Sequence, residues 1–254
     1  MSTPNKAARS PRVPKRQKPV LENKKQPEQR RATETYERIL AVTAQTLADV
    51  GIERLSTNLV CERAGLTPPA LYRYFPNKYA LLRELGERLL VRQNELIPHW
   101  ITPEVLAGAT VDLERALSGL IIDTYAVTER TPGGVWILRA LHAVPALQEV
   151  RLGSHFRVTQ EQTAVMAATF PSADVERLRL VGRIVVELIH STVELLCDEP
   201  LGAQTVAEIV AGMIASHLKR LRPEAESVGN ERRGTGGKDS QSAAGPVRRR
   251  VAGR

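Results

Sequence analysis

The sequence predicts an all-α protein. Aromatic residues supply only 4% of its 254 residues, whereas Leu, Ala, Val, Glu and Arg abound, and this balance favours helices over strands. Between residues 34 and 221, apolar residues recur at intervals of three and four, which is the spacing of one face of a helix. Pro and Gly divide this part of the chain into helical lengths joined by short loops. The chain is long enough for one large domain or two modest ones.

The first helix is expected over residues 34–50, and a short second helix after Ser56. The first helix carries an apolar stripe formed by Tyr36, Ile39, Leu40, Thr43, Leu47 and Val50. Gly51 follows at a position where helices commonly end in a left-handed conformation. The Ser56 hydroxyl can then accept a hydrogen bond from the free amides that open the second helix, and Gly65 ends that helix after about two turns.

A third helix is expected over residues 68–75, and a longer fourth helix after Pro76 and Asn77. Thr67 is placed to cap the third helix. The two prolines that follow it stand where a missing N–H costs nothing, because the first amides of a helix are unpaired. One face of the fourth helix repeats leucine, with Leu81, Leu82, Leu85, Leu89 and Leu96.

The last two helices are expected over residues 175–197 and 204–221. The final helix has one apolar face, formed by Val206, Ile209, Val210, Met213, Ile214, His217, Leu218 and Leu221. The helix before it has two apolar stripes, one of Leu178, Val181, Val185, Leu188 and Leu195 and one of Val186, Ile189, Val193 and Leu196. Because two apolar faces need two partners, we expect these helices to form a homodimer interface. Val186→Glu or Val193→Glu is then expected to split the dimer.

Basic residues concentrate at the two ends of the chain. Residues 1–33 hold ten Lys and Arg against two Glu, and residues 222–254 hold eight basic against four acidic residues. Both stretches are poor in large apolar side chains, so neither can offset the ordering entropy of about 1–2 kcal/mol per residue for the backbone. Disordered basic tails are therefore predicted over residues 1–32 and 222–254.

Several classes of protein are disfavoured by what the sequence lacks. Cys61 and Cys197 lie far apart and outside any C-x-x-C pair, which indicates a reducing compartment and no disulfide framework. No apolar run approaches the length of a membrane span, so a cytoplasmic protein is expected. Without a G-x-S-x-G, Walker A or Rossmann motif, neither an enzyme nor a cofactor is predicted. The single E-x-x-H of Glu187 and His190 indicates a polar pair in a pocket or subunit contact, and no metal site is predicted.

A helix-turn-helix is indicated by the tight spacing of residues 56–64, Gly65 and residues 67–75, because this motif presents its second helix to the DNA major groove. The sharpest part of the region is the run L-Y-R-Y-F-P-N-K that starts at Leu71, followed after two residues by L-L. This run is similar to the L-Y-x-H/Y-F-x-x-K-x-x-L-L pattern of the tetracycline-repressor (TetR) family. The whole window of residues 51–82 resembles the DNA-binding region of that family.

The resemblance covers roughly residues 33–93 and implies two domains. Residues 33–93 would form a three-helix DNA-binding domain with a helix-turn-helix, and residues 94–221 a helical domain for ligand binding and dimerisation. The implied function is that of a homodimeric transcription regulator, a repressor that a small-molecule effector releases from a palindromic operator. The alternative is a ligand-independent architectural protein that binds DNA through broad electrostatic affinity. For the basic tails, assistance in DNA binding and a merely solubilising role are both open.

The residues that the resemblance places at DNA are Ser56, Thr57, Pro68, Ala70, Tyr72, Arg73, Tyr74 and Lys78. Tyr72 and Lys78 stand near one end of the third helix, where a phenol and an ammonium group can reach phosphate oxygens. Pro68 and Pro69 offer no amide hydrogen, so contact with a thymine methyl group is favoured there over hydrogen bonds. Arg73 is either a reader of guanine or a solvated charge at the end of the helix.

The effector is expected to be mainly hydrophobic with one or two polar groups, bound near Trp136, His142 and His190. The resemblance assigns these residues to the regulatory domain, and they lie among apolar neighbours. An apolar cavity with a few polar groups is the usual form of a small-molecule site. The alternative reading is that the aromatic side chains of this domain are plain core and its histidines surface or hydrogen-bonded core residues.

Overall fold

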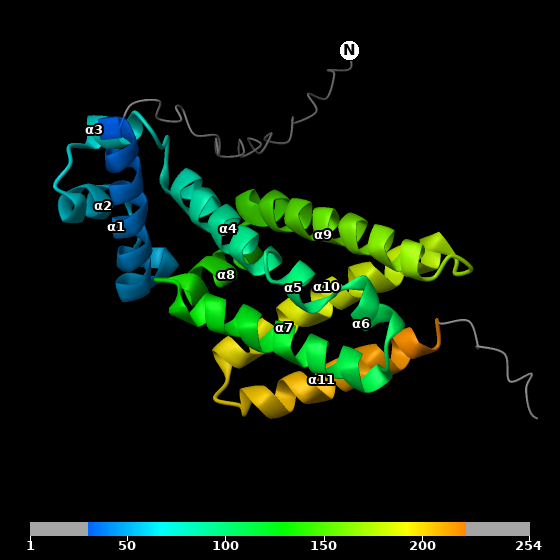
Figure 1. The fold of residues 1–254 in the computed structure, drawn as a ribbon. Helices are drawn as coiled ribbons and strands as arrows, with labels where there is room; N and C mark the ends of the chain where they lie inside the picture. Colours follow the sequence, from blue (N-terminus) through cyan, green and yellow to red (C-terminus); the bar gives the residue numbers. More distant parts are fainter. Residues whose placement is uncertain (1–29, 222–254) are drawn as a thin grey trace, which may run out of the picture.

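The computed structural model describes residues 30–221, which form eleven α-helices and one short 3-10 helix and contain no strand (Figure 1). The helices are α1 (Arg30–Arg54), α2 (Thr57–Ala64), α3 (Pro68–Tyr72), α4 (Lys78–Asn94), α5 (Ile97–Trp100), α6 (Pro103–Ala107), α7 (Thr110–Arg130), α8 (Gly134–Ala143), η1 (Pro145–Leu147), α9 (Gln148–Thr169), α10 (Val175–Asp198) and α11 (Ala203–Lys219). The predicted all-α class is confirmed. The predicted tails lie outside the described residues, except that α1 already begins at Arg30.

The kink at Gly51 explains why α1 continues past residue 50, where the first helix was predicted to end after starting at residue 34. Gly51 has a φ of 74°, a conformation that glycine adopts at no steric cost, and one further turn continues to Arg54. A Cβ atom at this position would lie 3.3 Å from the Trp136 ring, so the bend also lets α8 approach α1 closely. The kinked end of α1 therefore packs against α8.

The ends of α2 and α3 show one confirmed cap and one wrong prediction. The Ser56 side chain accepts a hydrogen bond from the Leu59 amide at 3.2 Å, as expected. Thr67 makes no such bond, because Pro69 has no N–H and the Ala70 amide donates to the Thr67 carbonyl at 3.0 Å. The third helix is also shorter than predicted, since α3 ends at Tyr72 instead of residue 75.

Helix α4 connects the two parts of the molecule. The Asn77 side chain caps it by accepting hydrogen bonds from the amides of Tyr79 and Ala80. It packs against α1 at one end and against α7, α8 and α9 along the rest of its length. Figure 1 shows α1, α2 and α3 gathered at one end of the molecule, with α4 leading away from them toward the larger bundle. Leu96 lies beyond α4, since that helix ends at Asn94.

The larger bundle is built on α7, α9, α10 and α11. Helix α7 packs against α10 and α11, and α9 packs against α10. One apolar core fills the space between α1–α4 and α8, and a second core joins α6, α7, α9, α10 and α11. Among residues 30–221, no helix is both long enough and apolar enough to cross a membrane.

An apolar surface on α10 and α11 remains exposed, and it differs from the predicted one. Its members are Leu180, Ile184, Leu188, Leu195, Ile209 and Met213, and we call it the α10–α11 face. Val186 is only 7% exposed and Val193 is fully buried, so both point into the interior of the chain's own fold. The expectation that glutamate at these two positions would act on a subunit contact is therefore wrong, because the helix turns a different stripe outward.

Candidate functional site

Two hydroxyl groups meet where α2 crosses α3. Thr57 Oγ1 and the Tyr72 hydroxyl lie 3.0 Å apart and share a hydrogen bond across the two helices. Tyr72 is 38% exposed, so the pair stands at the surface. Gly65 ends α2 with a φ of 61° and turns the chain toward α3. The structure thus brings together Ser56, Thr57 and Tyr72, three of the predicted DNA-contacting residues.

The outer side of α3 and the residue that follows this helix carry three more of the predicted residues. Pro68 and Arg73 are exposed, and Ala70 is half-buried. Tyr74 is placed differently: it is only 6% exposed, and its ring lies edge-on to Tyr36 at 6.1 Å between centroids. In this structure Tyr74 therefore belongs to the core between α1 and α3, and is not part of the surface that the other predicted residues form.

Lys78 ties the start of α4 to the end of α1. Its Nζ donates hydrogen bonds to the carbonyls of Ile52 at 3.4 Å and Leu55 at 3.3 Å. An ammonium group has three protons, so one remains for an outside acceptor such as a phosphate oxygen. Lys78 thus makes hydrogen bonds within the chain, besides the contact with a DNA phosphate that the sequence predicts.

Asn58 is an exposed amide that the reasoning from sequence did not single out. It follows Thr57 in the first turn of α2. An Asn amide can pair with an adenine edge through two hydrogen bonds. The sequence could have pointed to Asn58, because it is a polar residue at the second position of the first helix of the motif.

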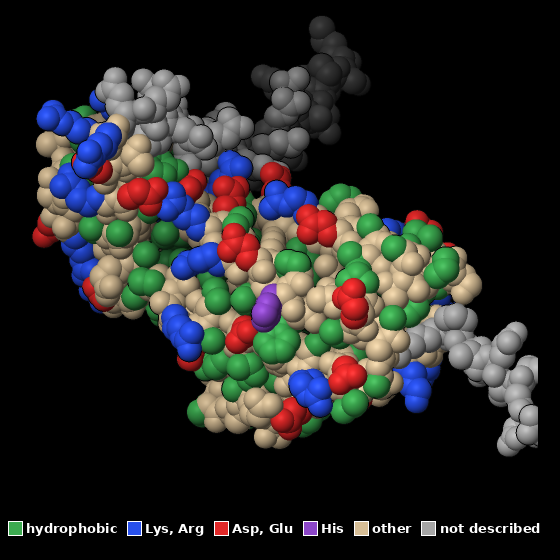
Figure 2. All heavy atoms as spheres, viewed as in Figure 1, with side chains coloured by type: hydrophobic (Ala, Val, Ile, Leu, Met, Phe, Trp, Pro, Cys, Tyr) green, Lys and Arg blue, Asp and Glu red, His purple; other side chains and the backbone are tan. Residues whose placement is uncertain are grey.

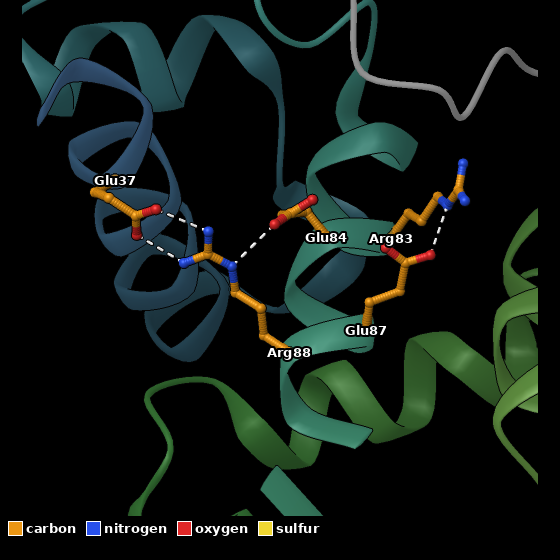
Figure 3. Close-up of polar contacts among 5 residues, drawn as sticks. All are labelled: Glu37, Arg83, Glu84, Glu87 and Arg88. Atoms are coloured by element: carbon orange, nitrogen blue, oxygen red, sulfur yellow. Dashed lines mark hydrogen bonds and ion pairs between the residues drawn. The ribbon is translucent and has the colours of Figure 1, made fainter. Parts of the chain in front are cut away.

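A charged network fixes α1 to α4, as Figure 3 shows. The Arg88 guanidinium on α4 donates two hydrogen bonds to the Glu37 carboxylate on α1, at 2.6 and 2.8 Å, and a third to Glu84 at 2.9 Å. Arg83 and Glu87 form a separate pair at 3.0 Å on the neighbouring side of α4. Hydrogen bonding to Arg88 lowers the pKa of Glu37. A two-pronged contact of this kind fixes orientation as well as distance, so α1 is held in one position on α4.

The larger bundle contains an apolar cavity of about 60 Å³. Its wall is formed by Ile97, Ile101, Leu106, Leu113, Leu117, Leu120, Val158, Gln162, Met166, Gly182, Val185, Val186, Ile189 and Leu218. Gln162 is the polar side chain among them. The cavity can hold a compact apolar group, and Gln162 can offer one hydrogen-bonding partner to it.

None of the three residues predicted to bind a ligand lines this cavity, and each makes contacts of its own elsewhere in the fold. Trp136 lies against Gly51, and the Arg139 guanidinium carbon stands over its indole ring, 4.9 Å from the centre of that ring. His142 pairs with Glu194 at 3.2 Å. His190 is buried, 7% exposed, and takes part in a different cluster.

That cluster is a buried stack of two histidines between α9 and α10. The rings of His155 and His190 are 4.3 Å apart and nearly parallel, and His155 Nδ1 lies 3.1 Å from a Glu187 oxygen. Arg183 and Arg151 also pair with Glu187. Burial lowers the pKa of both histidines. The hydrogen bonds of Glu187 to His155 and Arg183 lower the pKa of Glu187 to about 2. No group of residues within 30–221 has the make-up of a metal site.

The N-terminal helices match a known family. Residues 39–85 fit the family model described as "Bacterial regulatory proteins, tetR family". Tetracycline repressor protein class C of Escherichia coli is 44% identical over 54 residues, which are 21% of this chain and 25% of the repressor. The class A repressor from transposon 1721, also of Escherichia coli, is 38% identical over 56 residues, or 22% and 26% of the two chains. The chain thus spans about a quarter of the length of these relatives.

Solved structures share the fold over a longer stretch. A TetR-family regulator from Syntrophomonas wolfei has a TM-score of 0.57 at 13% identity, covering 73% of this chain and 95% of its own. One from Streptomyces coelicolor has a TM-score of 0.50 at 24% identity, covering 74% and 99%. Residues 39–85, which run from within α1 to within α4, therefore carry the DNA-binding region of the tetR family of bacterial regulatory proteins, and the rest of the described chain shares the fold of TetR-family regulators.

Proposed function

We propose that the protein is a sequence-specific DNA-binding regulator of transcription whose α2 and α3 enter a DNA groove. The TetR family consists of regulators and not of enzymes. The observation that carries the proposal is the Thr57–Tyr72 pair, which stands exposed where the two helices of the motif cross. Residues 33–93 would act as the DNA-binding part and residues 94–221 as the regulatory and dimerisation part.

The proposed contacts divide into two kinds. Ser56, Thr57, Tyr72 and Lys78 would position the protein on phosphates, because hydroxyl and ammonium groups donate to phosphate oxygens without reading sequence. Arg73 and the outer residues of α3 would face base edges. Figure 2 shows Lys and Arg side chains gathered at the end of the molecule that α1–α3 occupy, which suits a polyanion.

Removing a positioning contact should weaken binding to every DNA sequence by a similar factor. We expect this of Tyr72→Phe and Lys78→Ala, whereas Arg73→Ala should relax the preference at one base pair, at a cost of about 1–3 kcal/mol. Fluorescence anisotropy with a duplex selected from a random pool, and with an unrelated duplex, measures both effects. Since Lys78 also holds the carbonyls of Ile52 and Leu55, its variant needs a thermal melt beside the titration. Unchanged affinity of Lys78→Ala on both duplexes would count against the docking.

The same titrations separate the proposal from a ligand-independent architectural role. Non-specific binding depends almost wholly on neutralised phosphates, so its affinity falls steeply with salt and hardly varies with sequence. A regulator should instead prefer the selected duplex by a factor of about 10³ or more over unrelated DNA at the same salt. Equal affinity for both duplexes would favour the architectural role.

We further propose that the protein acts as a homodimer joined through the α10–α11 face. An exposed apolar surface that runs along two helices is unusual for a monomer. Two copies related by a two-fold axis would close a four-helix bundle over it. A two-fold dimer carries two copies of α3, which suits a palindromic operator.

The small-molecule effector would occupy the apolar cavity of the bundle. The curated relatives are named for tetracycline, and the cavity here is lined by apolar residues and Gln162. Two hydrogen bonds connect this bundle to α4: Gln93 donates to Thr128 on α7 at 2.8 Å, and Asn94 donates to Ser154 on α9 at 2.9 Å. A ligand that shifts α7 or α9 would thereby act on α4 and on the helices it carries, provided that it prefers the conformation that does not bind DNA.

A thermal-shift screen of apolar metabolites should find compounds that raise the melting temperature and weaken operator binding. Leu120→Phe should abolish the shift by filling the cavity, because Leu120 lines it. Leu152→Phe makes the same change on the exposed side of α9 and should leave the shift intact. A compound that stabilises the protein without changing operator affinity would support the cavity and contradict the switch.

A further inference from the structure

Two arginines and a histidine converge on one carboxylate oxygen between α9 and α10. Arg151 Nη1 lies 3.5 Å and His155 Nδ1 3.1 Å from Glu187 Oε1, and Arg183 Nη2 pairs with the same oxygen. His155 is only 1% exposed, and the parallel ring of His190 lies against its ring. We call Arg151, His155, Arg183 and Glu187 the Glu187 cluster.

The Glu187 cluster holds more hydrogen-bonding groups than its one carboxylate pairs. Within residues 30–221, five buried side-chain nitrogen or oxygen atoms have no hydrogen-bond partner, and three of them belong to this cluster: Arg151 Nε, Arg183 Nη1 and His155 Nε2. In each of these side chains the unpartnered nitrogen is bonded to the same carbon atom as the nitrogen that contacts Glu187. The three unpartnered nitrogens therefore lie close to one carboxylate oxygen. Since leaving buried polar groups unpaired is costly, a ligand that pairs them would be stabilised here.

The three nitrogens differ in what they can bind. Arginine N–H groups only donate, so Arg151 and Arg183 need an acceptor. A carboxylate only accepts, so His155 Nδ1 carries the proton that faces Glu187, and Nε2 of the neutral ring is an acceptor. A group that suits all three must accept from the guanidinium groups and donate one proton to the imidazole. A carboxylic acid has this combination, because its carbonyl oxygen accepts and its hydroxyl group donates.

We propose that the Glu187 cluster binds the acid group of a small carboxylic acid, with one proton held between that group and His155 Nε2. A carboxylate and one proton from the solvent bind together, and the complex retains both. The side chains of Arg183 and Glu187 are 32% and 35% exposed, so solvent reaches the outer side of the cluster. None of the four residues lines the apolar cavity, so this site is separate from the proposed effector site.

The affinity of this site should depend on pH. Burial lowers the pKa of His155, so its ring is neutral at pH 7 in the absence of a ligand. The other titratable groups that face the two stacked rings are Arg151 on α9, Arg183 and Glu187 on α10, and His142 on α8. A carboxylic acid in solution has a pKa near 4, so above pH 6.5 neither separate partner carries the proton that the complex holds. Affinity should therefore fall about tenfold for each pH unit above 6.5.

An NMR titration of the full-length protein with acetate tests the site, with the imidazole C–H signals as the readout. Sodium acetate replaces sodium chloride at constant ionic strength, so that general screening does not contribute. We expect a Kd in the millimolar range at pH 6.5, as suits so small a ligand, and about tenfold weaker binding at pH 7.5. An absence of binding at pH 6.5 would overturn the site. Equal affinity at the two pH values would overturn the proton shared with His155.

Three variants locate the acetate. Arg151→Gln removes a charged donor from the cluster and should weaken binding about tenfold or more, whereas Arg157→Gln, the same change on the exposed side of α9, should leave it unchanged. Leu120→Phe fills the apolar cavity and should also leave it unchanged, and a loss of binding there would contradict a separate site. Thermal melts report whether the variants fold, and Arg183→Gln replaces Arg151→Gln if that variant does not. Acetate affinity that survives in the folded arginine variant would overturn the assignment.

Discussion

Leu188→Glu is expected to convert a dimer into a folded monomer that has lost most of its operator affinity. Leu188 lies at the middle of the α10–α11 face and is 44% exposed within its own subunit, so a carboxylate there can remain solvated in the monomer. In the dimer it would be buried against apolar side chains without a partner, which is strongly unfavourable. Because two linked binding sites gain a factor of about 10²–10⁴ over one, affinity for a palindromic duplex should fall at least a hundredfold.

Sedimentation at micromolar concentration measures the first effect and titration with the selected duplex the second. Val193→Glu is the matched control, since Val193 is fully buried in its own subunit and a carboxylate there should disrupt the fold itself. The two variants thus separate loss of assembly from loss of structure. A Leu188→Glu protein that still sediments as a dimer would show that the α10–α11 face is not the subunit contact.

The second large effect is a loss of stability in mild acid. Burial lowers the pKa of His155 and His190 in the folded state below the usual value near 6.5. Below pH 6.5 the unfolded chain therefore binds protons that the folded chain excludes, so the free energy of unfolding falls as the pH falls, by up to about 1.4 kcal/mol per pH unit for each histidine. Arg151, Arg183 and His142 oppose protonation of the stack, whereas Glu187 favours it.

Glu187 adds to the loss of stability at lower pH. Its pKa is lowered to about 2, so the stability that its ionised form contributes is present above pH 4.5 and declines below it. Urea unfolding between pH 5 and 8 measures the contribution of the histidines. His190→Phe preserves a ring against His155 and should roughly halve the slope. A wild-type curve that is flat between pH 5 and 6.5 would contradict the assignment.

The local parts of the fold could be predicted because their causes are local. Gly51, Ser56 and Gly65 act within a few residues of the chain, and each lies where the structure bends, caps or ends a helix. Thr67 failed for an equally local reason that was visible in the sequence, because a proline two residues later removes the amide that a cap requires.

The predictions that failed to match the structure depended on contacts far apart in the sequence. Helical periodicity gives the apolar positions of α10 but not which of them face solvent, and Val193 is buried only because α10 packs against several other helices. Tyr74 lies in the core because Tyr36, on a different helix, stands opposite it. The cavity likewise joins side chains from six helices, a grouping to which no spacing along the chain points.

The close approach of Trp136 to Gly51 has a practical consequence. The chain contains two tryptophans, and they occupy distinct places: Trp136 touches the kinked end of α1, whereas Trp100 at the end of α5 lies against Gly119 of α7, with its indole donating to Asp123 at 2.8 Å. Indole emission responds to the polarity around the ring. A Trp100→Phe protein therefore has an intrinsic optical reporter of the α1–α8 contact, and a Trp136→Phe protein has one of the α5–α7 contact, so each contact can be followed without an attached dye.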